Sequence, residues 1–157
     1  MTFRDQAPGR LSSLVSFSIL VFICLAFTTA LPRSHKHQYV IADESSNGTN
    51  VKIRSSEVLL IDLPEQPGTG YGWQALKFDR GMWKMDKLDD EEVESLRKSG
   101  ILPAHALPKG RFGATEWAVF RLKPRKLGTT EIQLVYVRPW QPETPGKSFT
   151  LKVTTNE

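Results

Sequence analysis

The sequence predicts an all-β protein, a two-sheet β-sandwich of about seven strands with one short helix in a connection. Three observations support this fold class. Apolar and polar residues alternate along several short runs, Gly- and Pro-containing turns separate those runs, and only one segment has the spacing of an amphipathic helix. A chain of 157 residues is long enough for one domain of ordinary size.

Short runs with β-type patterning account for the strands. In "KSFTLKV" the Phe, Leu and Val point to one face and the polar residues to the other. In "TTEIQLVYV" the shared face carries Ile132, Leu134 and Tyr136. The remaining runs, in chain order, are "QYVIA", "NVKI", "VLLIDL", "YGWQALKF" and "TEWAVFRLK". Turn residues bound these runs, as expected for the strands of a sandwich.

The segment "DDEEVESLRKSG" is the exception and predicts a short helix. Asp89 and Glu92 have the spacing of a capping box, Glu94 and Lys98 form an i,i+4 pair, and Gly100 marks the end. Acidic residues in the first turn are stabilised by the helix dipole, which explains the acidic run. A calcium loop is not expected, because alternating oxygen ligands and a central glycine are missing.

The N-terminus has the layout of a secretory signal peptide. Residues 11–27 carry no charge, arginines precede them, and the small residues ending at Ala30 offer a cleavage site. We expect removal of residues 1–30, which leaves one domain, residues 31–157, with its core over roughly 39–153. The protein is then expected outside the cell or in secretory or lysosome-like vesicles. The alternative is membrane anchoring by an uncleaved residues 11–27, which are just long enough to span a bilayer.

Several features restrict the chemistry of the chain after residue 30. The only cysteine, Cys24, precedes it, so that part can form no disulfide and has no thiolate nucleophile. His35 and His37 lack a nearby third ligand, so no metal site is expected, and we expect no cofactor. The motif "NGT" at Asn47 predicts an N-glycosylation site in an accessible turn.

The charge of the chain does not favour a nucleic-acid partner. There are 21 Lys or Arg and 17 Asp or Glu, and without residues 1–30 the net charge is about +3. This surplus is too small for a nucleic-acid footprint. The basic cluster "KPRK" lies between two expected strands and is interpreted as a solvated turn.

The stretch "PEQPGTGYGW", residues 64–73, has a Gly-x-Gly pattern that is also typical of phosphate-binding loops. Such a loop needs a helix N-terminus behind it, because the helix amides bind the anion. The residues that follow have no N-cap and are interpreted as a strand, and the partner motifs of a protein kinase are missing. Catalysis is not expected either, since the histidines lie in a polar tail or a Pro-bracketed loop and the carboxylates have no common focus.

Three loops are expected to meet at one end of the sandwich: "PEQPGTG", "LPKGRFGA" and "RPWQPETPG". Each contains Gly and Pro, which restrict the backbone, and has a large aromatic residue within it or directly after it, which is Tyr71, Phe112 or Trp140. A rigid backbone with aromatic anchors suits a protein-binding tip, because little entropy is lost on docking. The same aromatics would also serve ordinary turns that close the end of a sandwich.

These three motifs, in this order, resemble the chagasin-like inhibitors of papain-type cysteine proteases, inhibitor family I42. "QPGTGYGW" is similar to the family's Asn-Pro-Thr-Thr-Gly-Tyr-x-Trp loop, "GRFG" with "ATEW" to its glycine-rich second loop, and "VYVRPWQ" to its Arg-Pro-Trp third loop. The resemblance implies an immunoglobulin-like sandwich that is not an enzyme and that blocks a protease cleft reversibly and non-covalently. The alternative is an immunoglobulin-like adhesion or receptor-binding module with no protease inhibition.

The resemblance also implies a role for each loop. The first loop would lie over the catalytic cysteine of the protease, with contacts from Gln66, Pro67, Gly68, Thr69, Gly70 and Tyr71. Trp73 would support that loop from its base. The flanks of the cleft would be held by the second loop, Gly110, Arg111, Phe112 and Gly113, and by the third, Arg138, Pro139 and Trp140. The implied partners are papain-like proteases of the cathepsin-L type, and the inhibitor is expected to be a monomer.

This chain departs from the family pattern in the first two loops. Gln66 stands where the family usually has Asn, and Gly68 stands where it has its first Thr. These changes alter the hydrogen bonds and the stiffness that the first loop can have. The second loop is longer than usual, and it carries Arg111 and Phe112 where the family commonly has small residues. We expect these differences to affect affinity or the choice of protease.

Overall fold

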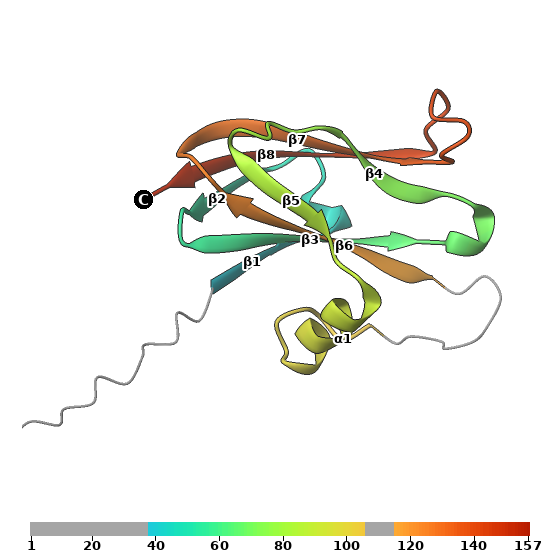
Figure 1. Ribbon diagram of the computed structural model, residues 1–157, viewed down its shortest axis with the longest axis horizontal. Helices are drawn as coiled ribbons and strands as arrows, with labels where there is room; N and C mark the ends of the chain where they lie inside the picture. The colour runs from blue at the N-terminus through green and yellow to red at the C-terminus, as the bar shows by residue number, and fades with distance from the viewer. Residues whose placement is uncertain (1–37, 106–114) are drawn as a thin grey trace, which may run out of the picture. The chain divides into compact units, whose positions relative to one another are not determined.

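The computed structural model describes residues 38–105 and 115–157, which form two four-stranded sheets packed face to face (Figure 1). The first sheet has the order β1-β3-β6-β5 and the second sheet the order β2-β8-β7-β4. The strands are β1 Gln38–Ala42, β2 Asn50–Arg54, β3 Glu57–Glu65, β4 Gly72–Lys77, β5 Trp83–Lys87, β6 Glu116–Pro124, β7 Gly128–Val137 and β8 Lys147–Asn156. The predicted all-β sandwich is confirmed.

The core lies between the two sheets and follows the alternation in the sequence. On β8 the buried apolar side chains are Phe149, Leu151 and Val153, and the residues between them point outward. The neighbouring strand β7 adds buried Ile132 and Leu134. The facing sheet contributes buried Leu59, Ile61 and Leu63 of β3 and Ala118, Phe120 and Leu122 of β6. Removing this apolar surface from water is the main stabilisation of the sandwich.

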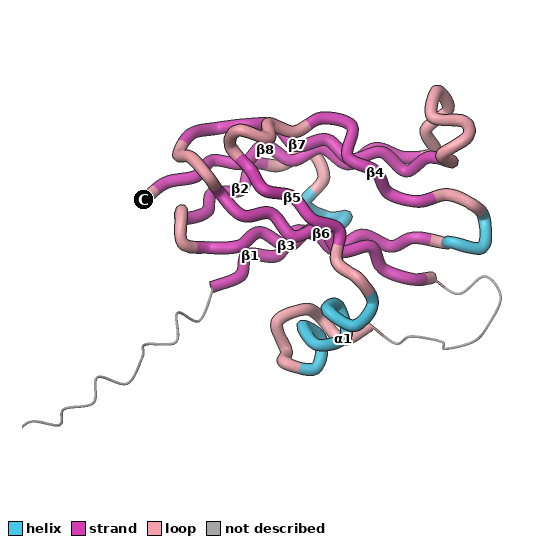
Figure 2. The backbone as a smooth tube through the Cα atoms, viewed as in Figure 1, coloured by secondary structure: helices cyan, strands magenta, loops and turns pink. Residues whose placement is uncertain are grey.

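Strand register places several connections at one end of the sandwich. Glu65 at the end of β3 pairs with Glu116 at the start of β6. In the second sheet Gly72 at the start of β4 pairs with Val137 at the end of β7. The connection from β3 to β4 and the connection from β7 to β8 therefore emerge together, as Figure 2 shows.

The predicted helix is α1, Asp90–Lys98. Asp89 is its N-cap, and its carboxylate accepts a hydrogen bond of 2.8 Å from the backbone N–H of Glu92. The Glu94–Lys98 ion pair forms at 2.9 Å, and Gly100 follows the helix end with φ of 71°. The reciprocal half of the expected capping box does not form, because the Glu92 carboxylate instead accepts a 2.9 Å hydrogen bond from Arg121 of β6.

The helix covers the outer face of the first sheet and creates a second apolar cluster. Val93 and Leu96 of α1 pack against buried Val58 and Leu60 of β3 and Val119 of β6. For this reason β3 is buried on both faces, which a sequence pattern of simple alternation does not indicate.

One strand was not expected from the sequence. β5 is a short strand at the edge of the first sheet and is rich in polar residues: Lys84 and Lys87 are exposed, and Asp86 is half-buried. Trp83 points inward and is 1% exposed, and Met85, two residues further on the same face, packs against the core. The described residues therefore contain eight strands instead of about seven.

The predicted signal peptide, residues 1–30, and the histidine pair near it lie outside the described residues. Among the residues that the structure describes, no helix combines the length and apolar character needed to cross a membrane.

Candidate functional site

The first loop, residues 66–71, connects β3 to β4 through a single 3-10 turn, η2 (Pro67–Thr69). The Thr69 N–H donates to the Gln66 carbonyl at 3.0 Å, and the Gly70 N–H donates to the Pro67 carbonyl at 2.9 Å. The Thr69 hydroxyl adds a 2.6 Å bond to the Gln66 carbonyl. Gly70 ends the turn at φ of 76°, a left-handed conformation that favours glycine. The loop is thus held by its own backbone.

Two aromatic side chains support the base of this loop. Trp73, which is 4% exposed, donates from Nε1 to the Pro64 carbonyl at 2.9 Å. The hydroxyl of Tyr136 accepts a 2.7 Å hydrogen bond from the Gln66 N–H. The Tyr136 ring lies 5.2 Å from the Trp73 ring and stacks on Tyr71 at 5.3 Å. Trp73 therefore belongs to the core below the loop, as its predicted supporting role requires.

The third loop, residues 138–146, connects β7 to β8 within the second sheet. The Gln141 N–H donates to the Arg138 carbonyl at 2.9 Å, and the Gly146 N–H donates to the Tyr136 carbonyl at 2.8 Å. The Arg138 guanidinium lies over the Tyr71 ring, 4.6 Å from its centroid, which is the geometry of a cation–π contact. The base of the third loop is therefore attached to the first.

Trp140 makes the contact between the two loops further out. A Cβ atom placed on Gly70 would lie 2.6 Å from Cη2 of Trp140. The indole ring thus occupies the space that the missing side chain leaves. Trp140 is nevertheless 66% exposed. The first and third loops form one surface with a large aromatic side chain at its edge.

The structure brings together the predicted residues of the first and third loops, but the second loop is not covered. Gly110, Arg111, Phe112 and Gly113 lie outside the described residues. His105 and Thr115 are the described residues on either side of that segment.

Sequence reasoning missed two contributors to this site. Tyr136 was assigned to the core face of its strand and does pack against the core, and its ring and hydroxyl also hold the first loop. Gly146 allows Tyr71 to approach, since a Cβ there would lie 3.3 Å from Cε1 of Tyr71. A tyrosine placed just before the Arg-Pro-Trp motif could have suggested the first role, because a buried phenol needs a hydrogen-bond partner.

Asn47, the predicted glycosylation site, lies in an exposed turn between η1 (Glu44–Ser46) and β2. Its side-chain amide contacts β8 twice: Nδ2 donates to the Ser148 carbonyl at 3.2 Å, and Oδ1 accepts from the Thr150 N–H at 2.8 Å. The side chain therefore attaches this turn to the second sheet.

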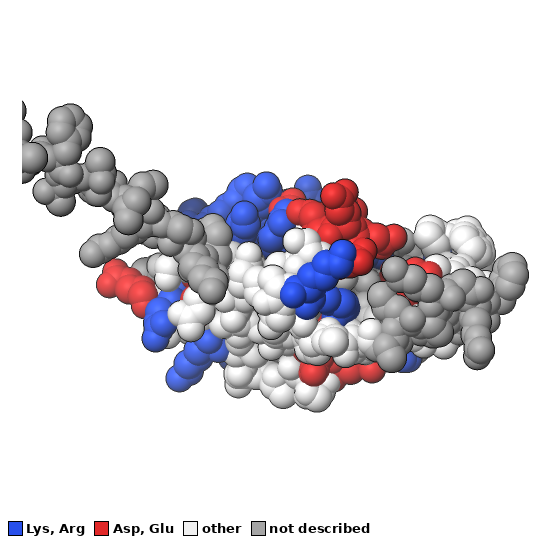
Figure 3. Space-filling model, turned by 90° about the horizontal axis from the view of Figure 1, so that it is seen from below, with Lys and Arg blue, Asp and Glu red and all other residues white. Residues whose placement is uncertain are grey.

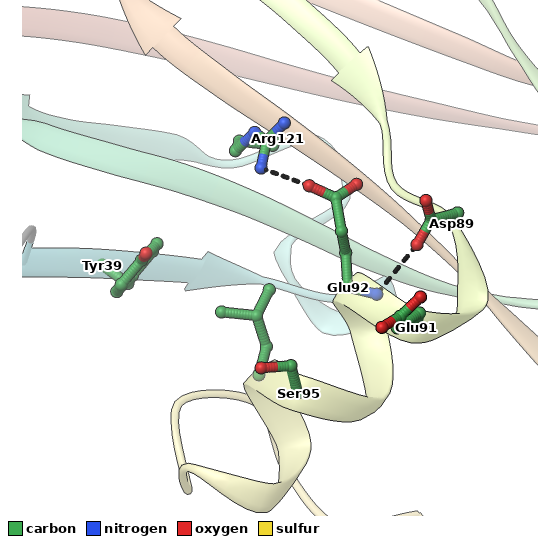
Figure 4. Close-up of a pocket in the computed structure, with 7 residues that line it drawn as sticks. Tyr39, Asp89, Glu91, Glu92, Ser95 and Arg121 are labelled. Atoms are coloured by element: carbon green, nitrogen blue, oxygen red, sulfur yellow. Dashed lines mark hydrogen bonds and ion pairs between the residues drawn. The ribbon is translucent and has the colours of Figure 1, made fainter.

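A polar hollow of about 360 Å³ lies between α1 and the first sheet, with Tyr39, Asp89, Glu91, Glu92, Ser95 and Arg121 around it (Figure 4). Three of its charged groups have partners: Arg121 pairs with Glu92, and Asp89 caps the helix. The Glu92–Arg121 pair thus attaches α1 to the sheet. On the face that contains α1, groups of acidic and basic side chains alternate and neither sign covers it (Figure 3).

Comparison with known proteins gives a consistent result. The profile of the chagasin family of peptidase inhibitors, I42, matches residues 52–153. Amoebiasin-2 of Entamoeba histolytica is 26% identical over 134 residues, covering 85% of this chain and 94% of the relative.

Solved structures of inhibitors share the fold. EhICP2, a cysteine protease inhibitor from Entamoeba histolytica, matches 77% of this chain and 98% of its own with a TM-score of 0.56 and 23% identity. PbICP-C, solved in complex with falcipain-2, matches 76% of this chain and 92% of its own with a TM-score of 0.50 and 17% identity. These likenesses confirm the immunoglobulin-like sandwich. Because the matching family model is that of peptidase inhibitors, the adhesion alternative is not favoured. The chain belongs to the chagasin family of peptidase inhibitors, as a protein inhibitor of cysteine proteases and not an enzyme.

Proposed function

We propose that the surface formed by the first and third loops enters the active-site cleft of papain-like proteases of the cathepsin-L type. The first loop, from Gln66 to Tyr71, lies over the catalytic thiolate. Arg138, Pro139 and Trp140 hold one flank of the cleft, and Gly110, Arg111, Phe112 and Gly113 hold the other. The observation that carries this proposal is the packing of Trp140 on Gly70, which joins two loops into one preformed surface.

The hydrogen bonds of the first loop explain how it would resist cleavage. The Gln66 carbonyl already accepts bonds from the N–H and the hydroxyl of Thr69, and the Pro67 carbonyl accepts one from Gly70. A carbonyl bound in this way is not free to enter an oxyanion hole in attack geometry. The loop would therefore occupy the cleft without being processed as a substrate.

Preformed geometry also supports tight binding. The 3-10 turn, its left-handed glycine and its aromatic base restrict the loop before it meets a protease. Less conformational entropy is then lost on association. Trp140 combines this restriction with a large exposed apolar area, which is typical of residues that dominate interface energies.

Titration of the purified inhibitor against papain and a cathepsin-L-type protease tests the proposal. We expect a stoichiometric loss of activity that is recovered on dilution, with the inhibitor chain intact by mass spectrometry. A fully active protease at micromolar inhibitor would contradict it. Sedimentation of the free inhibitor and of the mixture is expected to give a monomer and a one-to-one complex.

We further propose that the chain enters the secretory pathway and loses residues 1–30. This rests on the uncharged run 11–27 and the small residues ending at Ala30. N-terminal sequencing of the protein from a secreting eukaryotic host is expected to begin at Leu31. A membrane-bound product that retains Met1 would favour the anchor instead. Enzymatic deglycosylation of the same protein tests Asn47.

A further inference from the structure

Four side chains form a cluster on the outer face of the first sheet, where the chain enters and leaves the segment 106–114. They are Asp62 of β3, Arg97 of α1, His105 and Trp117 of β6. None of them belongs to the core between the two sheets. We refer to these four residues as the anchor cluster.

Asp62 is the centre of the anchor cluster and is 1% exposed. Its carboxylate accepts two hydrogen bonds from Arg97, at 3.1 and 3.2 Å, and lies 3.1 Å from Nε2 of His105. Arg97 also donates to the Pro103 carbonyl at 2.6 Å. One buried carboxylate therefore attaches the end of α1 and the residues after it to β3.

His105 and Trp117 connect the two sides of the segment 106–114. Their rings stack in parallel, with centroids 3.5 Å apart and an interplanar angle of 5°. The Arg97 guanidinium lies 5.9 Å from the Trp117 ring and adds a cationic contact. The residue that precedes the segment is thus held directly against the strand that follows it.

The need to stabilise α1 does not by itself explain why a charged pair, Asp62 and Arg97, is buried here. Burying an ion pair costs desolvation that its attraction barely repays, and an apolar substitute is often as stable. The apolar contacts of Val93 and Leu96 already attach α1 to the sheet. A buried bidentate pair does supply fixed geometry, since Arg97 and Asp62 can meet in few orientations.

We propose that His105 and Trp117 are positioning residues for the second loop, held in place by the Asp62–Arg97 pair. The proposal rests on the proposed function, in which Gly110 to Gly113 contact the protease. The anchor cluster fixes the distance and direction between the two ends of the loop. Binding then requires less ordering of the loop, so affinity rises without any contact between the cluster and the protease.

A thermodynamic cycle of inhibition constants tests this role. His105→Ala removes the ring and the contact to Asp62. We expect the inhibition constant for papain to rise about tenfold, because one or two more side chains must then be ordered on binding. His105→Phe keeps the ring on Trp117 and is expected to recover most of the affinity. The second background replaces residues 107–113 with Gly and Ser at constant length. There His105→Ala should have no further effect, because no specific loop is left to position.

A control variant distinguishes a positioning role from a general loss of folding stability. Val51→Ala shortens a half-buried side chain on β2 in the other sheet, so it should lower the melting temperature without changing inhibition. The proposal is overturned if His105→Ala inhibits as well as the unchanged chain, or if its effect is equally large in both backgrounds. If the loop replacement itself changes nothing, the proposed contact of the second loop fails, and the proposal fails with it. If the loop replacement weakens inhibition but the His105 variants do not, the positioning role is wrong and the proposed contact of the second loop is retained.

Discussion

The indole ring of Trp140 lies over Gly70, where a Cβ atom would approach its Cη2 to 2.6 Å. Gly70 belongs to the loop after β3, and Trp140 belongs to the loop after β7. The glycine at position 70 therefore has two structural effects. It permits the left-handed turn, and it leaves the space in which an exposed tryptophan is held.

Comparing Gly70→Ala with Gly48→Ala distinguishes the effect of backbone strain from the effect of displacing Trp140. Both glycines have φ near 75°, but a Cβ at Gly48 meets nothing within 4 Å. Each variant should lose about 1–2 kcal/mol of unfolding free energy through backbone strain. Only Gly70→Ala should also raise the inhibition constant, because it displaces Trp140. Equal inhibition by the two variants would show that the position of Trp140 does not matter.

Trp140→Ala is expected to weaken inhibition by about 30-fold, which corresponds to about 2 kcal/mol of binding free energy. Its melting temperature should change little, because the side chain is 66% exposed. Leu76→Ala is the matched control, since Leu76 is another apolar residue that is 62% exposed on β4. Enzyme titration and thermal denaturation check both variants. A large loss of stability in Trp140→Ala would assign the ring to the architecture of the loops.

Tyr136→Phe keeps the ring that stacks on Tyr71 and removes the hydroxyl that accepts from Gln66. We expect a loss of about 1 kcal/mol in unfolding free energy, the value of one ordinary hydrogen bond. Inhibition should weaken several-fold because the first loop is less well held. Tyr39→Phe serves as the control, since Tyr39 lies on β1, away from the loops. Unchanged inhibition in Tyr136→Phe would contradict a positioning role for this hydroxyl.

Gly68→Thr introduces the residue that the family pattern has at this position. A Cβ on Gly68 meets nothing within 4 Å, and its φ lies outside the left-handed region. The variant should therefore fold normally and gain up to about 1 kcal/mol, because the unfolded chain loses freedom. We expect tighter inhibition, measured by enzyme titration, as the loop becomes stiffer. Weaker inhibition would mean that the protease surface needs the small residue.

The pH dependence of stability should include Asp43, which caps η1. Its pKa is held below its ordinary value, mainly by the hydrogen bond from the Ser45 hydroxyl. A lowered pKa in the folded state means that the cap stabilises fully above the ordinary pKa, and that this contribution disappears as pH falls through the lowered value. Asp43→Asn lacks this charge, so it should be slightly less stable than the unchanged chain at neutral pH, and the difference should shrink in strong acid. Thermal denaturation across pH checks this.

The strength of local patterning explains which elements were predictable. β7, β8 and α1 carry clear periodicity or capping signals, and the sequence predicted them. β5 is a short edge strand with polar outward residues, so its pattern resembles a loop. Glu92 has the right spacing for a capping box, yet a charged partner on β6 competes successfully for its carboxylate.

The sequence by itself determined the sandwich class, the helix and the three motifs that identify the family, because each depends on neighbouring residues. Only the tertiary structure decided that Tyr136 holds Gln66, 70 positions away, and that Trp140 lies on Gly70. It also decided that Asp62 meets Arg97 and His105 beneath the helix. Such pairs depend on sheet register and on strands far apart in the chain. A local pattern carries no information about which distant side chain will face it.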